Sequence, residues 1–227
     1  MAANRAARRL LYRSPLCARA LFGTWLEPCD DLSFFELCTV VMRRALARDL
    51  RPGMRVLEVG TGPYAVLSLW AVKRFGVDIV GTEIEPSWAE RARKLAARNG
   101  TRLEIRTTDI VAGVDGPFDA VWFVPPFISR SRFDDVVASG WTGDARTLEL
   151  LALRSVGGEE GSELIARFYA DVVTRLSERG RTYVAYNNRH VDDERVTFHA
   201  RAAGLRVTSS VGLGPLPFRV QVAERPA

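Results

Sequence analysis

Three turns in the middle of the chain combine acidic residues and glycines in a way that could hold a nucleotide-like cofactor. The first, Glu58-Val59-Gly60-Thr61-Gly62-Pro63-Tyr64, follows a short apolar run. Glycines at positions 60 and 62 let the backbone come closer to a ligand than any side chain would allow, and amides that open a helix favour an anionic group. The acidic Glu58 would repel a pyrophosphate but suits a cofactor whose reactive end is positively charged.

Each of the other two turns also carries a carboxylate close to the end of an apolar run. The second, Val80-Gly81-Thr82-Glu83-Ile84-Glu85-Pro86, ends the next apolar run. A carboxylate at Glu83 can accept hydrogen bonds from both hydroxyls of a ribose, as in sites for NAD and for S-adenosylmethionine (SAM). The third, Thr107-Thr108-Asp109-Ile110, is placed to reach an adenine amine. Ala65 stands where a dinucleotide loop has its third glycine, and alanine is tolerated there, so the charge of Glu58 is what favours a sulfonium cofactor.

Alternating strand and helix patterns position these turns. Strands are predicted at 55–59, 77–81, 103–106, 118–123, 182–186, 205–210 and 218–222, and helices at 65–75, 86–99, 162–178 and 193–203. The stretch between residues 128 and 161 shows no regular pattern. Repeated strand and helix units require right-handed crossovers. The sequence therefore predicts an α/β fold with a Rossmann-like, doubly wound and mostly parallel sheet of seven strands.

In this order and at these spacings, the three turns closely resemble those of the class I SAM-dependent methyltransferases. The resemblance runs from about residue 50 to the end of the chain. One departure is Tyr64, which stands where the family usually has a third glycine and brings a phenol ring near the methionine end of the cofactor. The resemblance implies SAM as the cofactor, bound by Glu58, Gly60, Thr61, Gly62, Tyr64, Glu83, Ile84, Asp109, Ile110 and Val124.

The loop after the fourth strand, Phe123-Val124-Pro125-Pro126-Phe127, looks like the N-P-P-[YF] loop of the amino-methylating branch of this family. The run Gly157-Gly158-Glu159-Glu160-Gly161 resembles the segment that follows this loop in release-factor glutamine and ribosomal RNA adenine-N6 methyltransferases. In that branch the Asn side chain and a proline carbonyl accept the two hydrogens of a planar NH2 group. Val124 offers only a backbone carbonyl and an apolar surface, so this departure favours a different nucleophile.

The catalytic and acceptor-binding residues are predicted from the same rim of the sheet. The catalytic candidates are Val124, Pro125, Tyr186 and Asn187, and His190 is a further group able to take a proton near neutral pH. Aromatic faces suit a sulfonium through cation–π attraction of about 0.5–2 kcal/mol, although core packing is the commoner role of each aromatic taken separately. The predicted substrate contacts are Tyr12, Phe34, Pro126, Phe127 and Trp141.

The first part of the chain is predicted to be helical, with helices up to Phe22 and from Leu32 to Leu50, the second capped by Asp30 or Asp31. We expect residues 1–50 to form an N-terminal lid over a catalytic domain at 51–227. These helices are too few for a separate recognition domain of the kind that holds ribosomes or long RNA. A small-molecule substrate is therefore favoured over a macromolecule.

Composition narrows the choice of partners. The chain has 32 basic and 27 acidic residues, and the basic ones other than Lys73 and Lys94 are arginines spread along the whole sequence, so nucleic acid is allowed but not favoured. Cys17, Cys29 and Cys38 lack C-x-x-C spacing, which predicts free thiols and no metal site. No apolar run reaches membrane length, so we expect a soluble, cytoplasmic protein. No pattern sets the oligomeric state.

Three functions remain open from the sequence. The first is methyl transfer from SAM to a small-molecule acceptor in specialised metabolism, with S-adenosylhomocysteine as co-product. The second is a SAM cyclase or lyase, in which the α-amine of SAM attacks its own γ-carbon to give azetidine-2-carboxylate and methylthioadenosine. The third is an N-methyltransferase directed at RNA or protein, or a SAM-binding module without catalysis.

Overall fold

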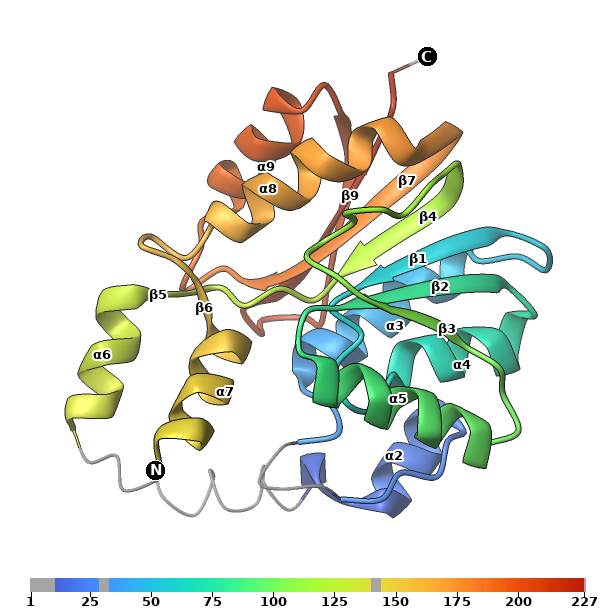
Figure 1. Ribbon diagram of the computed structural model, residues 1–227. Coiled ribbons are helices and arrows are strands. Elements are labelled where there is room, and N and C mark those ends of the chain that lie inside the picture. The colour runs from blue at the N-terminus through green and yellow to red at the C-terminus, as the bar shows by residue number, and fades with distance from the viewer. Residues whose placement is uncertain (1–10, 29–32, 140–143, 227) are drawn as a thin grey trace.

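A seven-stranded sheet forms the centre of the molecule (Figure 1). The computed structural model describes residues 11–28, 33–139 and 144–226. The strand order is β3-β2-β1-β4-β7-β9-β8, and neighbouring strands are parallel except where β9 pairs with β7 and β8. The predicted doubly wound, mostly parallel sheet of seven strands is confirmed. The strands are β1 (Arg55–Val59), β2 (Asp78–Glu83), β3 (Glu104–Thr107), β4 (Phe118–Phe123), β7 (Leu176–Asn187), β8 (Arg206–Gly212) and β9 (Phe218–Glu224).

Helices cover both faces of the sheet, as Figure 1 shows. One face carries α3 (Leu37–Asp49), α4 (Val66–Phe75) and α5 (Pro86–Arg98), with α2 (Pro15–Phe22) packed outside α4. The other face carries α8 (Glu163–Val172) and α9 (Asp193–Ala202). Each face has its own cluster of buried apolar side chains. Because both faces are covered, the strands are buried and their carboxyl ends form the free edge on which a ligand can bind.

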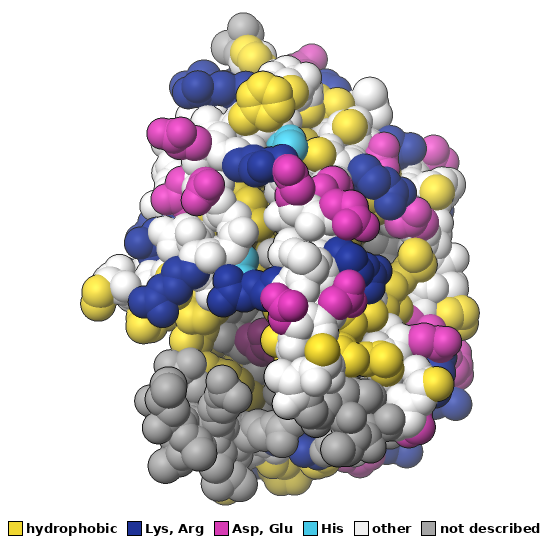
Figure 2. All heavy atoms as spheres, turned by 90° about the vertical axis from the view of Figure 1, so that its left-hand side faces the viewer, with side chains coloured by type: hydrophobic (Ala, Val, Ile, Leu, Met, Phe, Trp, Pro, Cys, Tyr) yellow, Lys and Arg dark blue, Asp and Glu magenta, His cyan; other side chains and the backbone are white. Residues whose placement is uncertain are grey.

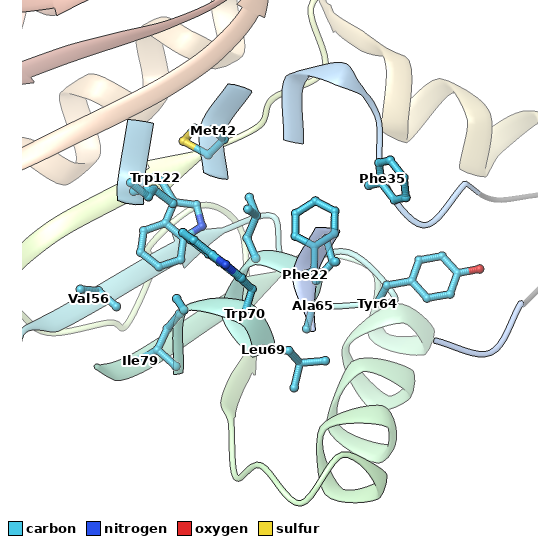
Figure 3. Close-up of a cluster of buried hydrophobic side chains, with 14 of the residues drawn as sticks. Phe22, Phe35, Met42, Val56, Tyr64, Ala65, Leu69, Trp70, Ile79 and Trp122 are labelled. Carbon is cyan, nitrogen blue, oxygen red and sulfur yellow. The ribbon is translucent and has the colours of Figure 1, made fainter. Parts of the chain in front are cut away.

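The helices before residue 50 share the core of the sheet. Phe22 of α2 lies between Phe35 and Trp70, and Met42 of α3 faces Trp122 of β4 (Figure 3). The rings of Phe22 and Phe35 are 5.3 Å apart between centroids. Apolar packing of this kind holds α3 against the sheet and α2 against α4. The expected action of residues 1–50 as a lid stays a prediction.

Helix α3 begins five residues later than predicted, at Leu37 rather than Leu32. Glu36 is its N-cap, and the Glu36 amide donates a hydrogen bond to Thr39 Oγ1 at 3.2 Å. The predicted caps Asp30 and Asp31 lie outside the described residues. Phe34 and Phe35, which precede the helix, are both buried, and the chain bends at Phe34 before the helix begins.

The described part of the stretch predicted to be irregular contains four elements. They are β5 (Ile128–Ser129), α6 (Arg130–Ala138), α7 (Ala145–Ser155) and β6 (Val156–Gly158). Strands β5 and β6 pair in parallel as a separate sheet, from which α6 and α7 extend on the side of the carboxyl ends of the main strands (Figure 1). A capping signal for α7 was present in the sequence, since Asp144 Oδ1 accepts from the Thr147 amide at 2.8 Å.

The boundary between α8 and β7 also differs from the prediction. The helix ends at Val172, a short 3-10 turn covers Val173–Arg175, and β7 starts at Leu176, whereas the sequence predicted a helix to residue 178 and a strand from 182. Gly180 lies inside the strand, where the register against β4 shifts. A Cβ at Gly180 would lie 2.6 Å from the Phe118 carbonyl oxygen, so only glycine allows the two strands to approach this closely here.

Candidate active site

A cavity of about 810 Å³ opens at the carboxyl ends of β1, β2 and β4. This volume lies within the range of about 300–1,000 Å³ that is usual for small-molecule sites. The cavity is lined by all ten residues predicted to bind the cofactor: Glu58, Gly60, Thr61, Gly62, Tyr64, Glu83, Ile84, Asp109, Ile110 and Val124. The three turns singled out in the sequence therefore meet in one place.

The glycine turn presents bare backbone to the cavity. Gly60 and Gly62 have φ angles of +66° and +67°, which favour glycine, and a Cβ at Gly60 would lie 3.0 Å from the Phe123 ring. Thr61 fastens the turn to β2, because its amide and its hydroxyl both donate to the Thr82 carbonyl, at 2.9 and 3.1 Å. The turn therefore leaves its backbone open to a closely approaching ligand.

Glu83 holds the end of β2 against the glycine turn. One carboxylate oxygen accepts from the Gly62 amide at 2.8 Å and the other from the Glu85 amide at 3.0 Å. Burial raises the pKa of Glu83, and these amide hydrogen bonds oppose the rise. Each carboxylate oxygen has a second lone pair, so Glu83 can still accept from a ligand hydroxyl.

Glu58 places a deeply buried carboxyl group on the floor of the cavity. Burial raises its pKa from an ordinary 4.5 to about 7, and the hydrogen bond donated by the Ser68 hydroxyl opposes this rise. A buried carboxylate without a cationic partner is costly, and a ligand that brings a positive charge relieves this cost. The donor set of the cavity therefore fits a cofactor with a cationic end.

The loop after β3 forms the third side of the cofactor half. Thr82 Oγ1 donates to the Ile110 carbonyl at 2.6 Å, which ties this loop to β2. Ile110 has a φ of +48°, a strained backbone for a β-branched residue. Asp109 pairs with Arg167 of α8 at 2.7 Å, and both side chains line the edge of the cavity.

The second half of the cavity is walled by Val124, Pro125, Pro126 and Phe127, the loop after β4. Phe34 also lines the cavity, and its ring lies edge-on to Tyr64 of the glycine turn with 4.9 Å between centroids. Figure 3 shows the Tyr64 ring pointing away from the buried cluster around Trp70. The cavity therefore continues from the cofactor turns into a largely apolar space next to Val124.

No family model matches the chain, but individual relatives and solved structures do. The chain is 38% identical over 101 residues to the ribosomal protein L11 methyltransferase of Thermosipho africanus, covering 44% of this chain and 35% of the relative. It is 25% identical over 170 residues to a putative protein N5-glutamine methyltransferase of Methanocaldococcus jannaschii, covering 75% of this chain and 73% of the relative. It thus spans about a third of the first relative and about three quarters of the second.

A third relative, the protein-L-isoaspartate O-methyltransferase of Rhizobium meliloti, is 32% identical over 140 residues, covering 59% of this chain and 67% of the relative. The fold matches a methyltransferase of Pyrococcus furiosus with a TM-score of 0.71 at 21% identity, covering 99% of this chain and 100% of that one. The chain belongs to the class I SAM-dependent methyltransferases. The predictions of this family and of SAM as cofactor are confirmed.

Three residues predicted for this methyltransferase's chemistry lie elsewhere. Tyr186, Asn187 and Tyr12 do not line the cavity. Tyr186 is buried under α8 and α9, where its hydroxyl donates to Asp193 at 2.7 Å. Asn187 Oδ1 accepts from the Arg189 amide at 3.0 Å. Their strand does end at the rim of the sheet, but Tyr186 projects toward the helices of the opposite face.

The remaining candidates are placed as follows. The Tyr12 ring packs edge-on against Phe35 at 5.5 Å, and Trp141 lies outside the described residues. His190 packs against Phe127, with 5.7 Å between ring centroids, but does not line the cavity. Burial lowers the pKa of His190, and nearby Arg132 lowers it further.

The structure adds cavity residues that the sequence did not indicate. Glu36 and Cys38 line it from the N-terminal side, and Glu149, Leu153 and Arg154 of α7 line it from the opposite side. Burial raises the pKa of the Cys38 thiol. Among the described residues, Cys17 and Cys38 are free thiols and no cluster of His, Cys, Asp or Glu could hold a metal ion. No described helix has both the length and the apolar character needed to cross a membrane.

Replacing Gly157 by alanine is expected to disrupt the loop after β4. A Cβ at this position would lie 2.4 Å from the Gly161 carbonyl oxygen and 2.6 Å from that of Pro126, and both are backbone atoms that cannot rotate away. We expect a loss of about 1–3 kcal/mol in the free energy of unfolding, measured by urea denaturation. Glu159→Ala is the control, because Glu159 is an exposed residue of the same turn. Equal stability of the two variants would contradict the close packing of β6 on the loop.

Proposed function

We propose that this protein transfers the methyl group of SAM to a small-molecule acceptor seated between Phe34 and the loop Val124–Phe127. The observation that carries the proposal is the enclosure of the acceptor half. Helix α7 covers it from one side, and Arg154 of α7 reaches across to Glu36 at 2.7 Å. An acceptor has to fit beneath this bridge, which favours a small molecule over the surface of a macromolecule.

When bound, SAM supplies a methyl carbon that is already activated by the sulfonium. The acceptor's lone pair forms a bond to this carbon, the carbon–sulfur bond breaks with its electrons staying on sulfur, and S-adenosylhomocysteine leaves. The protein contributes mainly alignment. Glu58 and Glu83 bind the cofactor, while Val124 and Phe127 pack against the acceptor and orient it toward the methyl group. Val124 supplies no side-chain acceptor for an NH2 group, so a nucleophile other than a planar amide or adenine amine fits best.

A second candidate is methyl transfer to a protein side chain. Its support is that the three relatives are named for ribosomal protein L11, protein glutamine and protein isoaspartate. The face of the molecule nearest α6 carries basic and acidic side chains next to each other (Figure 2). A mixed surface of this kind suits a protein partner better than the phosphate backbone of RNA.

One experiment separates these candidates. The purified protein is incubated with SAM carrying a labelled methyl group, together with a cell extract divided by molecular mass. Label in the low-mass fraction, with equimolar S-adenosylhomocysteine, supports the first proposal, whereas label in protein supports the second. Methylthioadenosine formed from SAM alone would overturn both in favour of ring closure.

A further inference from the structure

Helix α7 packs less tightly than α8 on the opposite side of the site. None of its eleven side chains is buried, although it contains leucines at 148, 150, 151 and 153. By contrast, α8 buries Ile165, Phe168, Tyr169 and Val172. Yet α7 forms a wall of the cavity through Glu149, Ala152, Leu153, Arg154 and Ser155. Its leucines at 148, 150 and 151 are only partly buried, so polar contacts add to what holds its position.

An ion pair near each end of α7 supplies such contacts. Near its start, Arg146 pairs with Glu85 at 2.9 Å. Near its end, Arg154 pairs with Glu36 at 2.7 Å. The first partner precedes α5 and the second precedes α3, so the helix is tied to two parts of the fold that flank the cavity.

The Arg146 contact leads directly to the cofactor turn. Glu85 is the N-cap of α5, and its amide donates to Glu83 at 3.0 Å. Glu83 in turn accepts from the Gly62 amide on the glycine turn. The Ser87 hydroxyl and then Arg146 hold the pKa of Glu85 below its usual range. Glu85 thus links the guanidinium of Arg146 to Glu83, the carboxylate expected to bind the ribose.

We propose that Arg146 is a positioning residue for SAM, which fixes the Glu83 turn through Glu85 and couples this turn to the acceptor wall formed by α7. The coupling is reciprocal, because a ligand that steadies α7 also steadies the cofactor turn. The proposal rests on the cofactor site of the proposed function and does not depend on the identity of the acceptor.

The test is the dissociation constant of SAM for Arg146→Ala, measured by titration calorimetry. We expect it to rise about two- to fivefold, as for the loss of one partly exposed ion pair. The ratio of the dissociation constant of the variant to that of the wild type should approach one in 1 M NaCl, where such ion pairs are screened. The direction of the change in affinity distinguishes two roles of Arg146. SAM carries a positively charged sulfonium, so if Arg146 acted only through its long-range charge, its removal would tighten binding.

Three further variants complete the test. Arg146→Lys should restore part of the affinity, and Glu85→Gln combined with Arg146→Ala should bind no worse than Glu85→Gln alone. Lys94→Ala is the control. It removes a different cation, which pairs with Glu90 of α5 at 3.3 Å, and should leave SAM binding unchanged. Unchanged or tighter binding by Arg146→Ala would overturn the inference while leaving methyl transfer intact. Weaker binding by a protein that transfers no methyl group would overturn the proposed function alone.

Discussion

Replacement of Glu83 by alanine is expected to raise the dissociation constant for SAM at least about tenfold. A hydrogen bond to a charged group is worth about 1.5–3 kcal/mol, and a tenfold change in affinity corresponds to about 1.4 kcal/mol. The variant loses the carboxylate expected to accept from the ribose. It also leaves the amides of Gly62 and Glu85 without their present acceptor, so the glycine turn loses a support.

Titration calorimetry of Glu83→Ala and Glu83→Gln distinguishes these two contributions. Glutamine keeps the shape but has one oxygen, so it can satisfy only one of the two amides, and we expect an affinity between those of wild type and Glu83→Ala. Glu104→Ala is the matched control, since Glu104 is an exposed carboxylate on the neighbouring strand β3. Wild-type affinity in Glu83→Ala would show that the end of β2 does not hold the cofactor.

The cofactor half of the site could be predicted because its positions follow from strand ends. In a parallel sheet the carboxyl ends of neighbouring strands meet at one edge. Glu58, Glu83 and Asp109 each follow or end a short apolar run, so local patterns were enough to bring them together. The structure confirms the fold and places all three carboxylates in one cavity.

The acceptor half could not be predicted in the same way. Arg154 and Glu36 are 118 positions apart and meet only because the segment between β5 and β6 folds back over the cavity. No periodic pattern encodes such a pair. Tyr186 shows a second limit: the sequence placed it at the rim, but its side chain faces the core under α9.

The affinity for SAM is expected to depend on pH through Glu58. Its pKa is raised to about 7 in the protein without ligand, chiefly by burial. The positive charge of the cofactor favours the carboxylate, so binding lowers this pKa and releases a proton. Between pH 6 and pH 8 the dissociation constant should therefore fall by about tenfold, in proportion to the ionised fraction.

The same shift predicts an opposite trend in the stability of the protein without SAM. Because the pKa in the folded state lies above the ordinary 4.5, the contribution of Glu58 to stability is fully present below that pH and is lost as the pH rises through about 7. We expect Glu58→Gln to remove both trends and to bind SAM weakly at every pH, since its amide carries no charge. Calorimetry in buffers with different ionisation enthalpies measures the proton release directly. If the wild type released no proton near pH 7, Glu58 would not be meeting the positive charge of the cofactor, and its carboxyl group would serve only the hydrogen bond with Ser68.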